Sequence, residues 1–388
     1  MPVVAMIGAQ VVAVVLLTRF LPDFDRVLLS AIAALAAIGL TTLLSLAATA
    51  DDSGPFFAEV ANRQAIFVTC GFLVLVVGAL LARHLEVLRA YPYSLLTLAL
   101  LLTAATMVAG ETVNGARLWL AVGPVRFQPA EIGRVLLALF VAVFLYERRN
   151  LLRVPWRVGP VDLPPAPYLL PLGVALLAAV AVLVLQNDLG MAALLALGAA
   201  TAVFAVGGHP TLMLLVSAGF AAAAVGAFHT VSRVQDRLVG WLDPWRDPSA
   251  VGFQFVQSEF ALSAGGIVGE ANARNLSNVP EVHTDFALTA IGTVLGVAGA
   301  MAVLALAALI VCRCVIAALR VSGGLQSFVV LSITALFAMQ AILIAGGTLR
   351  VLPLTGLTFP FVSYGGTSLL TSFLSMGIVI GVGARSRC

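Results

Sequence analysis

The sequence predicts an all-α membrane protein whose chain crosses the bilayer many times. Of its 388 residues, 61% are hydrophobic and only 10% are charged, whereas a soluble domain carries about 25% charged residues. Apolar runs of about 20 residues, the length that spans a bilayer as a helix, recur along the chain. All 21 basic residues are arginine, which excludes reactions that depend on a lysine amine.

Eleven apolar runs are candidate membrane-spanning helices, and polar connections separate them. No basic residues precede the first run and no small-residue cleavage site ends it, so we expect a retained helix rather than a signal peptide. The runs cover residues 2–18, 27–49, 64–83, 92–109, 130–146, 167–186, 189–207, 211–230, 286–312, 325–346 and 367–384.

Arginine is concentrated in alternate connections, which predicts the orientation of the chain because cytoplasmic loops are rich in basic residues. The connections after the first, third, fifth, ninth and last runs carry these arginines, and we expect them in the cytoplasm. The acidic Asp51-Asp52 connection then lies outside, together with segments 110–129, 231–285 and 347–366.

The 231–285 connection is the only long, charge-rich stretch between apolar runs. It ends in Val-Pro-Glu-Val-His-Thr-Asp-Phe at 279–286, which places Asp285 at the threshold of the next run. A carboxylate at that depth costs free energy to bury and can be reached from the water side. We therefore expect the chemistry in this loop and in the few other polar interruptions.

Segment 110–131 contains glycine and proline residues that break helices, and its Trp119 suits the membrane interface. Glu131 and Arg134 lie three residues apart on the helix that follows, close enough to pair. The residues alone leave two interpretations open: a pair that neutralises itself at the mouth of the helix, or a pair that faces a ligand.

Two further interruptions are informative. Asp188, in Gln186-Asn-Asp-Leu-Gly190, is placed to cap the helix that follows it. Residues 347–368 hold so many helix breakers that we expect an irregular segment packed against protein, since lipid cannot satisfy its backbone polar groups.

These stretches together resemble the SEDS family of shape, elongation, division and sporulation proteins. Any one motif is weak, but the set occurs in order from about Phe24 to the end of the chain, which is specific. The matching stretches are Asn114 to Arg134 with its Phe-Gln-Pro-Ala-Glu core, Gln186 to Gly190, Arg237 to Trp245, Phe253 to Ser258, Pro280 to Asp285, and Pro353 to Ser368 with its Ser-Tyr-Gly-Gly-Thr-Ser end.

The resemblance implies a ten-helix membrane domain at 24–388, preceded by one extra transmembrane helix at 1–23. It implies a peptidoglycan glycosyltransferase that polymerises lipid II on the outer face of the bacterial cytoplasmic membrane, for cell elongation and shape or for division. The implied partners are lipid II, a class B penicillin-binding protein and membrane lipid, and we expect no nucleic acid.

The resemblance also assigns site residues. Asp285 matches the family's essential aspartate, and we expect it to act as the general base for the acceptor's 4-hydroxyl. His283 is expected to orient it through a hydrogen bond. Matched motifs or nearby positions supply the expected substrate-binding residues, namely Glu131, Arg134, Arg117, Trp119, Arg126, Arg237, His283, Ser363 and Tyr364.

Positive charge must stabilise the departing diphosphate, and the planar fork of arginine suits phosphate. The candidates are Arg134, Arg117, Arg126 and Arg237, and the sequence does not rank them. A divalent cation, Mg²⁺ or Mn²⁺, is a further candidate for sharing this task, because Mg²⁺ commonly binds through one carboxylate and substrate phosphates.

Departures from the family pattern keep other functions open. The motif lysine is Arg134, its serine is Ala130, and the usual Gly-Glu-Glu-Leu-Gly reads Gly292-Thr-Val-Leu-Gly296. One alternative is a lipid II flippase or other transporter that makes no bond, and another is a non-catalytic scaffold of the wall-synthesis complex. The gathering of polar residues on the expected outer rim favours the enzyme over the transporter.

Overall fold

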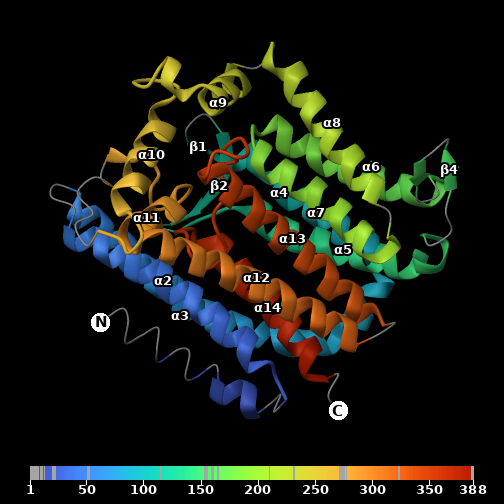
Figure 1. Cartoon of the computed structure of the whole chain (residues 1–388). Coiled ribbons are helices and arrows are strands. Elements are labelled where there is room, and N and C mark those ends of the chain that lie inside the picture. Colours follow the sequence, from blue (N-terminus) through green and yellow to red (C-terminus); the bar gives the residue numbers. More distant parts are fainter. Residues whose placement is uncertain are drawn as a thin grey trace.

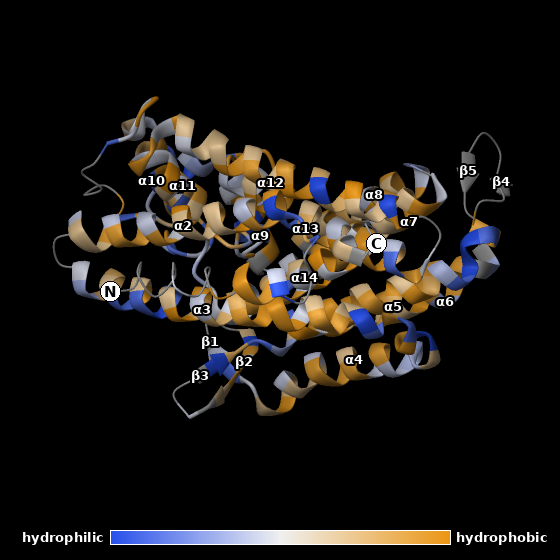
Figure 2. Cartoon of the chain, turned by 90° about the horizontal axis from the view of Figure 1, so that it is seen from below, coloured by the Kyte–Doolittle hydropathy of each residue, from blue (hydrophilic) through white to orange (hydrophobic). Residues whose placement is uncertain are grey.

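Long apolar helices lying alongside one another form the bulk of the protein (Figure 1). In this computed structural model, hydrophobic residues run along the helices and hydrophilic ones lie mainly at helix ends and connections (Figure 2). The structure describes residues 8, 12, 14–19, 23–49, 53–113, 116–123, 125–152, 156–158, 161–163, 166–208, 210–229, 232–270, 276, 278–321 and 324–385.

Within these described ranges, eight helices are long and apolar enough to cross a membrane, and two shorter apolar helices accompany them. The predicted all-α, multi-pass membrane architecture is therefore confirmed. The ten are α2 (Arg26–Thr49), α3 (Gly54–Leu81), α4 (Pro92–Ala109), α5 (Pro129–Leu152), α6 (Ala166–Leu185), α7 (Leu189–Gly207), α8 (Pro210–Phe228), α12 (Gly296–Arg320), α13 (Leu325–Thr348) and α14 (Gly366–Arg385).

The extra N-terminal helix expected at 1–23 lies largely outside the described residues. Residues 14–19 are helical, and the side chain of Leu17 is buried. The predicted run at 64–83 is a longer helix than expected, because α3 begins at Gly54. Its polar first turns are accommodated by an exposed ion pair between Glu59 and Arg63, which leaves Phe57 to face the core.

The run predicted at 286–312 is two helices rather than one. The first is α11 (Ala287–Val294), and α12 starts directly after Leu295. Gly296 adopts φ +70° at the break, a conformation that a residue with a side chain rarely takes. The turn at 266–269 fills the break, because the carbonyl oxygens of Gly266 and Ile267 accept hydrogen bonds from the first turn of α12.

The connections are more ordered than the sequence indicates. Segment 110–129 contains a three-stranded antiparallel sheet in the order β1-β2-β3, made of Glu111–Val113, Ala116–Val122 and Val125–Phe127. The 231–285 connection contains α9 (Ser232–Leu242), the 3-10 helix η2 (Pro244–Arg246) and α10 (Phe253–Gly265). Elsewhere η1 (Ala82–Ala90) is a 3-10 helix, and β4 (Trp156–Val158) pairs with β5 (Val161–Leu163).

Residues 349–365, called here the irregular segment, contain no helix or strand. As predicted, the segment packs against protein, and its Phe359 and Phe361 are among the most buried side chains in the described part. Hydrogen bonds join it and its neighbours to the other connections: Trp241 bonds to Arg350, and Tyr364 to His283. The predicted outer connections thus meet at one end of the bundle (Figure 1).

Candidate functional site

Asp285 lies in a tight turn at residues 279–286, called here the aspartate turn. The carbonyl oxygen of Glu281, itself at φ +51°, accepts hydrogen bonds from the backbone N–H groups of Thr284 and Phe286. Phe286 is fully buried and anchors the end of the turn at the start of α11. The turn therefore presents Asp285 from a backbone that is held on both sides.

The irregular segment fixes the aspartate turn through Ser363. Its hydroxyl donates to the carbonyl oxygen of Thr284 at 2.7 Å and accepts the backbone N–H of Phe359 at 2.9 Å. The backbone N–H of Tyr364 donates to the carbonyl oxygen of His283 at 2.8 Å. Ser363, predicted as a substrate-binding residue, is thus placed to hold the backbone beside Asp285.

Asp285 and Arg237 converge on one glycine of the irregular segment. A Cβ built on Gly356 would lie 3.8 Å from Oδ2 of Asp285 and 3.6 Å from Nη2 of Arg237. Gly356 has φ +73°, so both its backbone conformation and its lack of a side chain suit this place. The result is a carboxylate and a guanidinium facing the same small volume.

The pKa of Asp285 is raised to about 7, mainly by burial and also by the nearby charge of Glu281, while Arg237 and a hydrogen bond from Thr284 oppose the rise. A desolvated carboxylate loses hydration that its ionised form needs. A pKa near the working pH is what a general base requires, because the group is then both ionised and basic.

A second carboxylate, Asp188, also lies within electrostatic reach of Arg237. It caps α7 as predicted, accepting the backbone N–H of Met191 at 3.1 Å, and it accepts Nε2 of Gln128 at 3.3 Å. Its pKa is raised to about 6, mainly by burial and also by the charge of Glu131, while the hydrogen bond from Met191 and the charge of Arg237 oppose the rise. Arg237 thus acts electrostatically on both Asp188 and Asp285.

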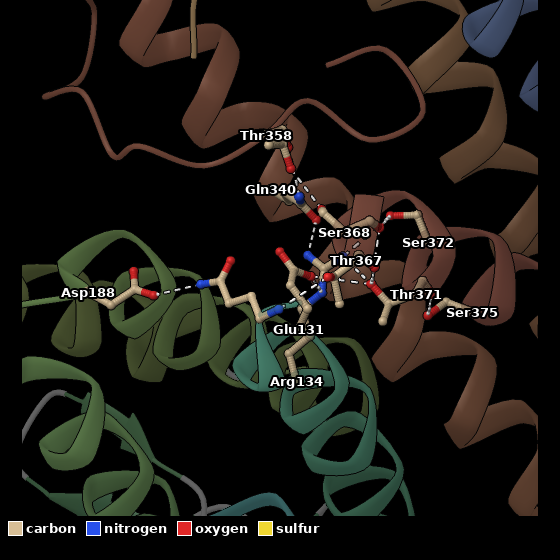
Figure 3. Close-up of polar contacts among 11 residues, drawn as sticks. Glu131, Arg134, Asp188, Gln340, Thr358, Thr367, Ser368, Thr371, Ser372 and Ser375 are labelled. Atoms are coloured by element: carbon tan, nitrogen blue, oxygen red, sulfur yellow. Dashed lines mark hydrogen bonds and ion pairs between the residues drawn. The ribbon is translucent and has the colours of Figure 1, made fainter. Parts of the chain in front are cut away.

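Glu131 and Arg134 pair as predicted, with Arg134 Nε 2.7 Å from Glu131 Oε2. Their side chains are only 5% and 6% exposed, so the pair is enclosed by protein. Nη1 of Arg134 donates to Gln340 Oε1 at 2.5 Å, and Nη2 donates to the hydroxyls of Thr371 and Ser372. We call these five residues the arginine cluster (Figure 3).

The arginine cluster favours one of the two interpretations of the Glu131–Arg134 pair. Three nitrogen atoms of Arg134 point at different protein partners, so its planar guanidinium joins three side chains. Because these groups bind protein, the geometry favours the self-neutralising pair over direct contact with a diphosphate.

The arginine cluster also reaches the site through Gln340. Its Nε2 donates to the carbonyl oxygen of Thr358 at 2.8 Å, two residues from Gly356. Sequence reasoning missed Gln340, Gly356 and Thr358. Gln340 could have been found, because a polar glutamine inside an apolar run is a signal of function. Gly356 and Thr358 lie in a segment rich in helix breakers, where nothing distinguishes them from their neighbours.

The three remaining predicted residues of segment 110–129 lie in the small sheet. Nε of Arg117 donates to Thr112 at 3.1 Å, and Arg126 pairs with Glu111 at 3.1 Å, both at exposed positions. Trp119 lies on β2 with Arg117, and Arg126 lies on β3. The described contacts of Arg117 and Arg126 are within the sheet, so the structure does not bring them together with Asp285.

His283 does not make the expected hydrogen bond to Asp285 in the described structure. Its ring packs edge-on against Phe56, with centroids 5.4 Å apart, and lies 5.9 Å from the ring of Tyr364. Burial lowers the pKa of His283. The His283 ring lies among the aromatic rings of Phe56, Phe57 and Tyr364 instead.

A divalent cation held by protein side chains alone needs several ligands. Among the described residues, no group of three or more His, Cys, Asp or Glu side chains is arranged to hold a metal ion. Asp285 and Asp188 face Arg237 instead. The cation expected from the sequence would bind through one carboxylate and substrate phosphates, so it stays a prediction.

Comparison with known proteins gives a consistent result. The family model for FtsW, RodA and SpoVE, described as "Cell cycle protein", matches residues 26–387. The peptidoglycan glycosyltransferase RodA of Mycobacterium bovis is 31% identical over 374 residues, covering 95% of this chain and 80% of that protein. A probable peptidoglycan glycosyltransferase FtsW of Geobacter sp. is 30% identical, covering 95% of this chain and 99% of that protein.

Solved structures agree with the sequence comparison. A structure described as "Structural coordination of polymerization and crosslinking by a peptidoglycan synthase complex" superposes with a TM-score of 0.75 at 28% identity, covering 94% of this chain and 98% of that one. The crystal structure of Thermus thermophilus RodA gives a TM-score of 0.65 at 26% identity, covering 93% of this chain and 96% of that one. The resemblance read from the motifs is therefore confirmed, and this chain belongs to the FtsW/RodA/SpoVE family, the SEDS proteins.

Proposed function

We propose that this protein is a peptidoglycan glycosyltransferase that polymerises lipid II on the outer face of the cytoplasmic membrane. The observation that carries the proposal is the convergence of Asp285 and Arg237 on Gly356. A base and a fixed positive charge are the two groups that sugar transfer from a polyprenyl diphosphate needs. The names of the relatives support the same activity.

In the proposed reaction, Asp285 takes the proton from the acceptor's 4-hydroxyl as that oxygen attacks the anomeric carbon of the donor sugar. The bond from that carbon to the diphosphate breaks, and the diphosphate leaves with the electron pair. Arg237 stabilises the negative charge that develops on it, because a guanidinium fork matches phosphate oxygens. Of the four arginines predicted for the diphosphate, Arg237 is the one beside Asp285 in the described structure.

Other residues position these two. Ser363 holds the aspartate turn, and the arginine cluster supports the irregular segment through Gln340 and Thr358. We assign Glu131 and Arg134 to this supporting role. A class B penicillin-binding protein is the proposed partner, in keeping with the synthase complex that this fold resembles.

The central test is the Asp285→Asn variant, assayed as purified protein with its partner and lipid II and scored for glycan polymer. The amide keeps the shape but cannot accept the proton, so polymerisation is expected to fall by about 10²- to 10⁴-fold. Asp236→Asn is the matched control, because Asp236 is an exposed carboxylate on the same outer connection and should polymerise normally.

The outcomes separate the three functions. A folded Asp285→Asn variant that polymerises at the parent rate overturns the role of Asp285. A flippase would translocate lipid II without making polymer, and a scaffold would make none even with Asp285 present.

The proposed orientation has its own test. Cysteine placed at Ser249, between η2 and α10, should react with a membrane-impermeant maleimide added outside cells. Cysteine placed at Val158, in β4, should not. The reverse labelling pattern would place Asp285 in the cytoplasm and remove the outer-face mechanism.

A further inference from the structure

Arg350, at the start of the irregular segment, adopts an unusual backbone conformation. Its φ is +57°, in the left-handed region that costs a residue with a side chain free energy. Such a residue persists where its surroundings hold it. Arg350 belongs to none of the site residues predicted from the sequence.

Two contacts hold Arg350. Its Nη1 lies 2.7 Å from Oε1 of Glu259, on α10, and its carbonyl oxygen accepts Nε1 of Trp241, on α9, at 3.1 Å. One residue at the end of α13 therefore joins both helices of the outer connection. Its side chain and that of Glu259 are 34% and 38% exposed, so the pair alone adds little stability.

The helix that Trp241 anchors is the one that carries Arg237. The two residues are four apart on α9 and therefore share a face of the helix. Arg237 faces Gly356, while Trp241 bonds to Arg350. The α9 helix thus touches the irregular segment at two points, one beside the reacting groups and one away from them.

We propose that Arg350 is a positioning residue that docks α9 and α10 on the end of α13 and so holds Arg237 beside Asp285. This inference rests on the proposed function, since Arg237 matters only if it acts on substrate. Arg350 itself lies away from the substrate. Its left-handed backbone turns the carbonyl oxygen toward Trp241, and its side chain reaches back to Glu259.

The decisive variant is Glu259→Gln, which removes the ion pair and leaves the backbone at Arg350 unchanged. We expect polymerisation to fall by about two- to five-fold, the effect that a partly exposed ion pair supports. Exchanging the charges, with Glu259→Arg and Arg350→Glu together, should recover at least half of that loss. Glu59→Gln, which breaks an exposed ion pair on α3, is the matched control and should not change the rate.

A double-mutant cycle tests whether the effect passes through Arg237. In an Arg237→Ala background, Glu259→Gln should cause no further loss, because the group that it positions is gone. If the two losses multiply instead, Arg350 does not act through Arg237, and the inference is wrong.

Hydrogen–deuterium exchange supplies a readout that does not depend on activity. In Glu259→Gln, the amides of residues 232–242 should exchange faster than in the parent protein, while those of α3 stay the same. If the exchange of α9 does not change, the docking claim fails even in an active protein. If the parent makes no polymer, the proposed function fails, and the exchange result alone decides whether Arg350 docks α9.

Discussion

The arginine cluster and the site at Gly356 each bring an acid and an arginine together, yet they differ in what the charges face. In the cluster, Glu131 and Arg134 are bonded at 2.7 Å, and the remaining groups of Arg134 bind protein side chains. At the second site, Asp285 of the aspartate turn and Arg237 of α9 both face Gly356, which has no side chain to occupy the space.

The difference shows how one fold uses charge in two ways. A buried charge that is fully hydrogen-bonded holds helices together and has little left to offer a substrate. A carboxylate that is desolvated without such a set of partners keeps a raised pKa, as Asp285 does, and can exchange a proton near neutral pH. An acid and an arginine that lie close together are therefore not by themselves evidence of a catalytic role.

The largest expected effect is the loss of stability when the arginine cluster is broken. Arg134→Met leaves Glu131 as a buried charge without its partner, so unfolding in detergent should require about 3–5 kcal/mol less free energy. Replacing both residues, Glu131→Gln with Arg134→Met, should recover much of this loss. Arg63→Met is the control from an exposed ion pair, and its melting temperature should stay close to that of the parent. If Arg134→Met melts like this control, the cluster does not support the fold.

The next effect concerns the space between Asp285 and Arg237. Gly356→Ala should cost about 1–2 kcal/mol in stability because of its φ of +73°. It should also lower polymerisation by about tenfold or more, because a methyl group would occupy the space between the reacting groups, where substrate must be positioned. Gly208→Ala is the matched control: its φ is +74° and a Cβ there meets no atom within 4 Å. Equal polymerisation by the two variants would show that the space beside Gly356 is not used by substrate.

The smallest expected effect is a shift in the pH dependence of polymerisation. As Asp285 acts when ionised, polymerisation should rise with pH and level off above its pKa of about 7. Glu281→Gln removes a negative charge that raises this pKa, so the rising limb of kcat/KM should move to lower pH. The amide can still accept the hydroxyl of Thr284, which the carboxylate accepts at 3.1 Å. Glu270→Gln, an exposed acid of the same connection, should leave the limb in place. If the rising limb of kcat/KM stays at the same pH in Glu281→Gln, the titrating group is not Asp285.

Local sequence patterns predicted most of the helices, but their ends depended on contacts. Hydropathy placed α2 and α13 almost to the residue, because each run of apolar side chains must be helical in lipid. It missed the break at Gly296, where backbone from the 266–269 turn enters. It also missed the strands β1–β3, whose short lengths carry little periodic signal.

The amino-acid sequence by itself determined that the chain is a bundle of membrane helices, that Glu131 and Arg134 would pair and that Asp188 would cap α7. Each of these depends on residues within a few positions of one another. The tertiary structure decided the rest: Arg134 is closed off by Gln340 on α13 and Thr371 on α14, while Arg237 meets Asp285 at Gly356. Which of several arginines stands beside the aspartate depends on how distant segments pack, and spacing along the chain carries no record of that.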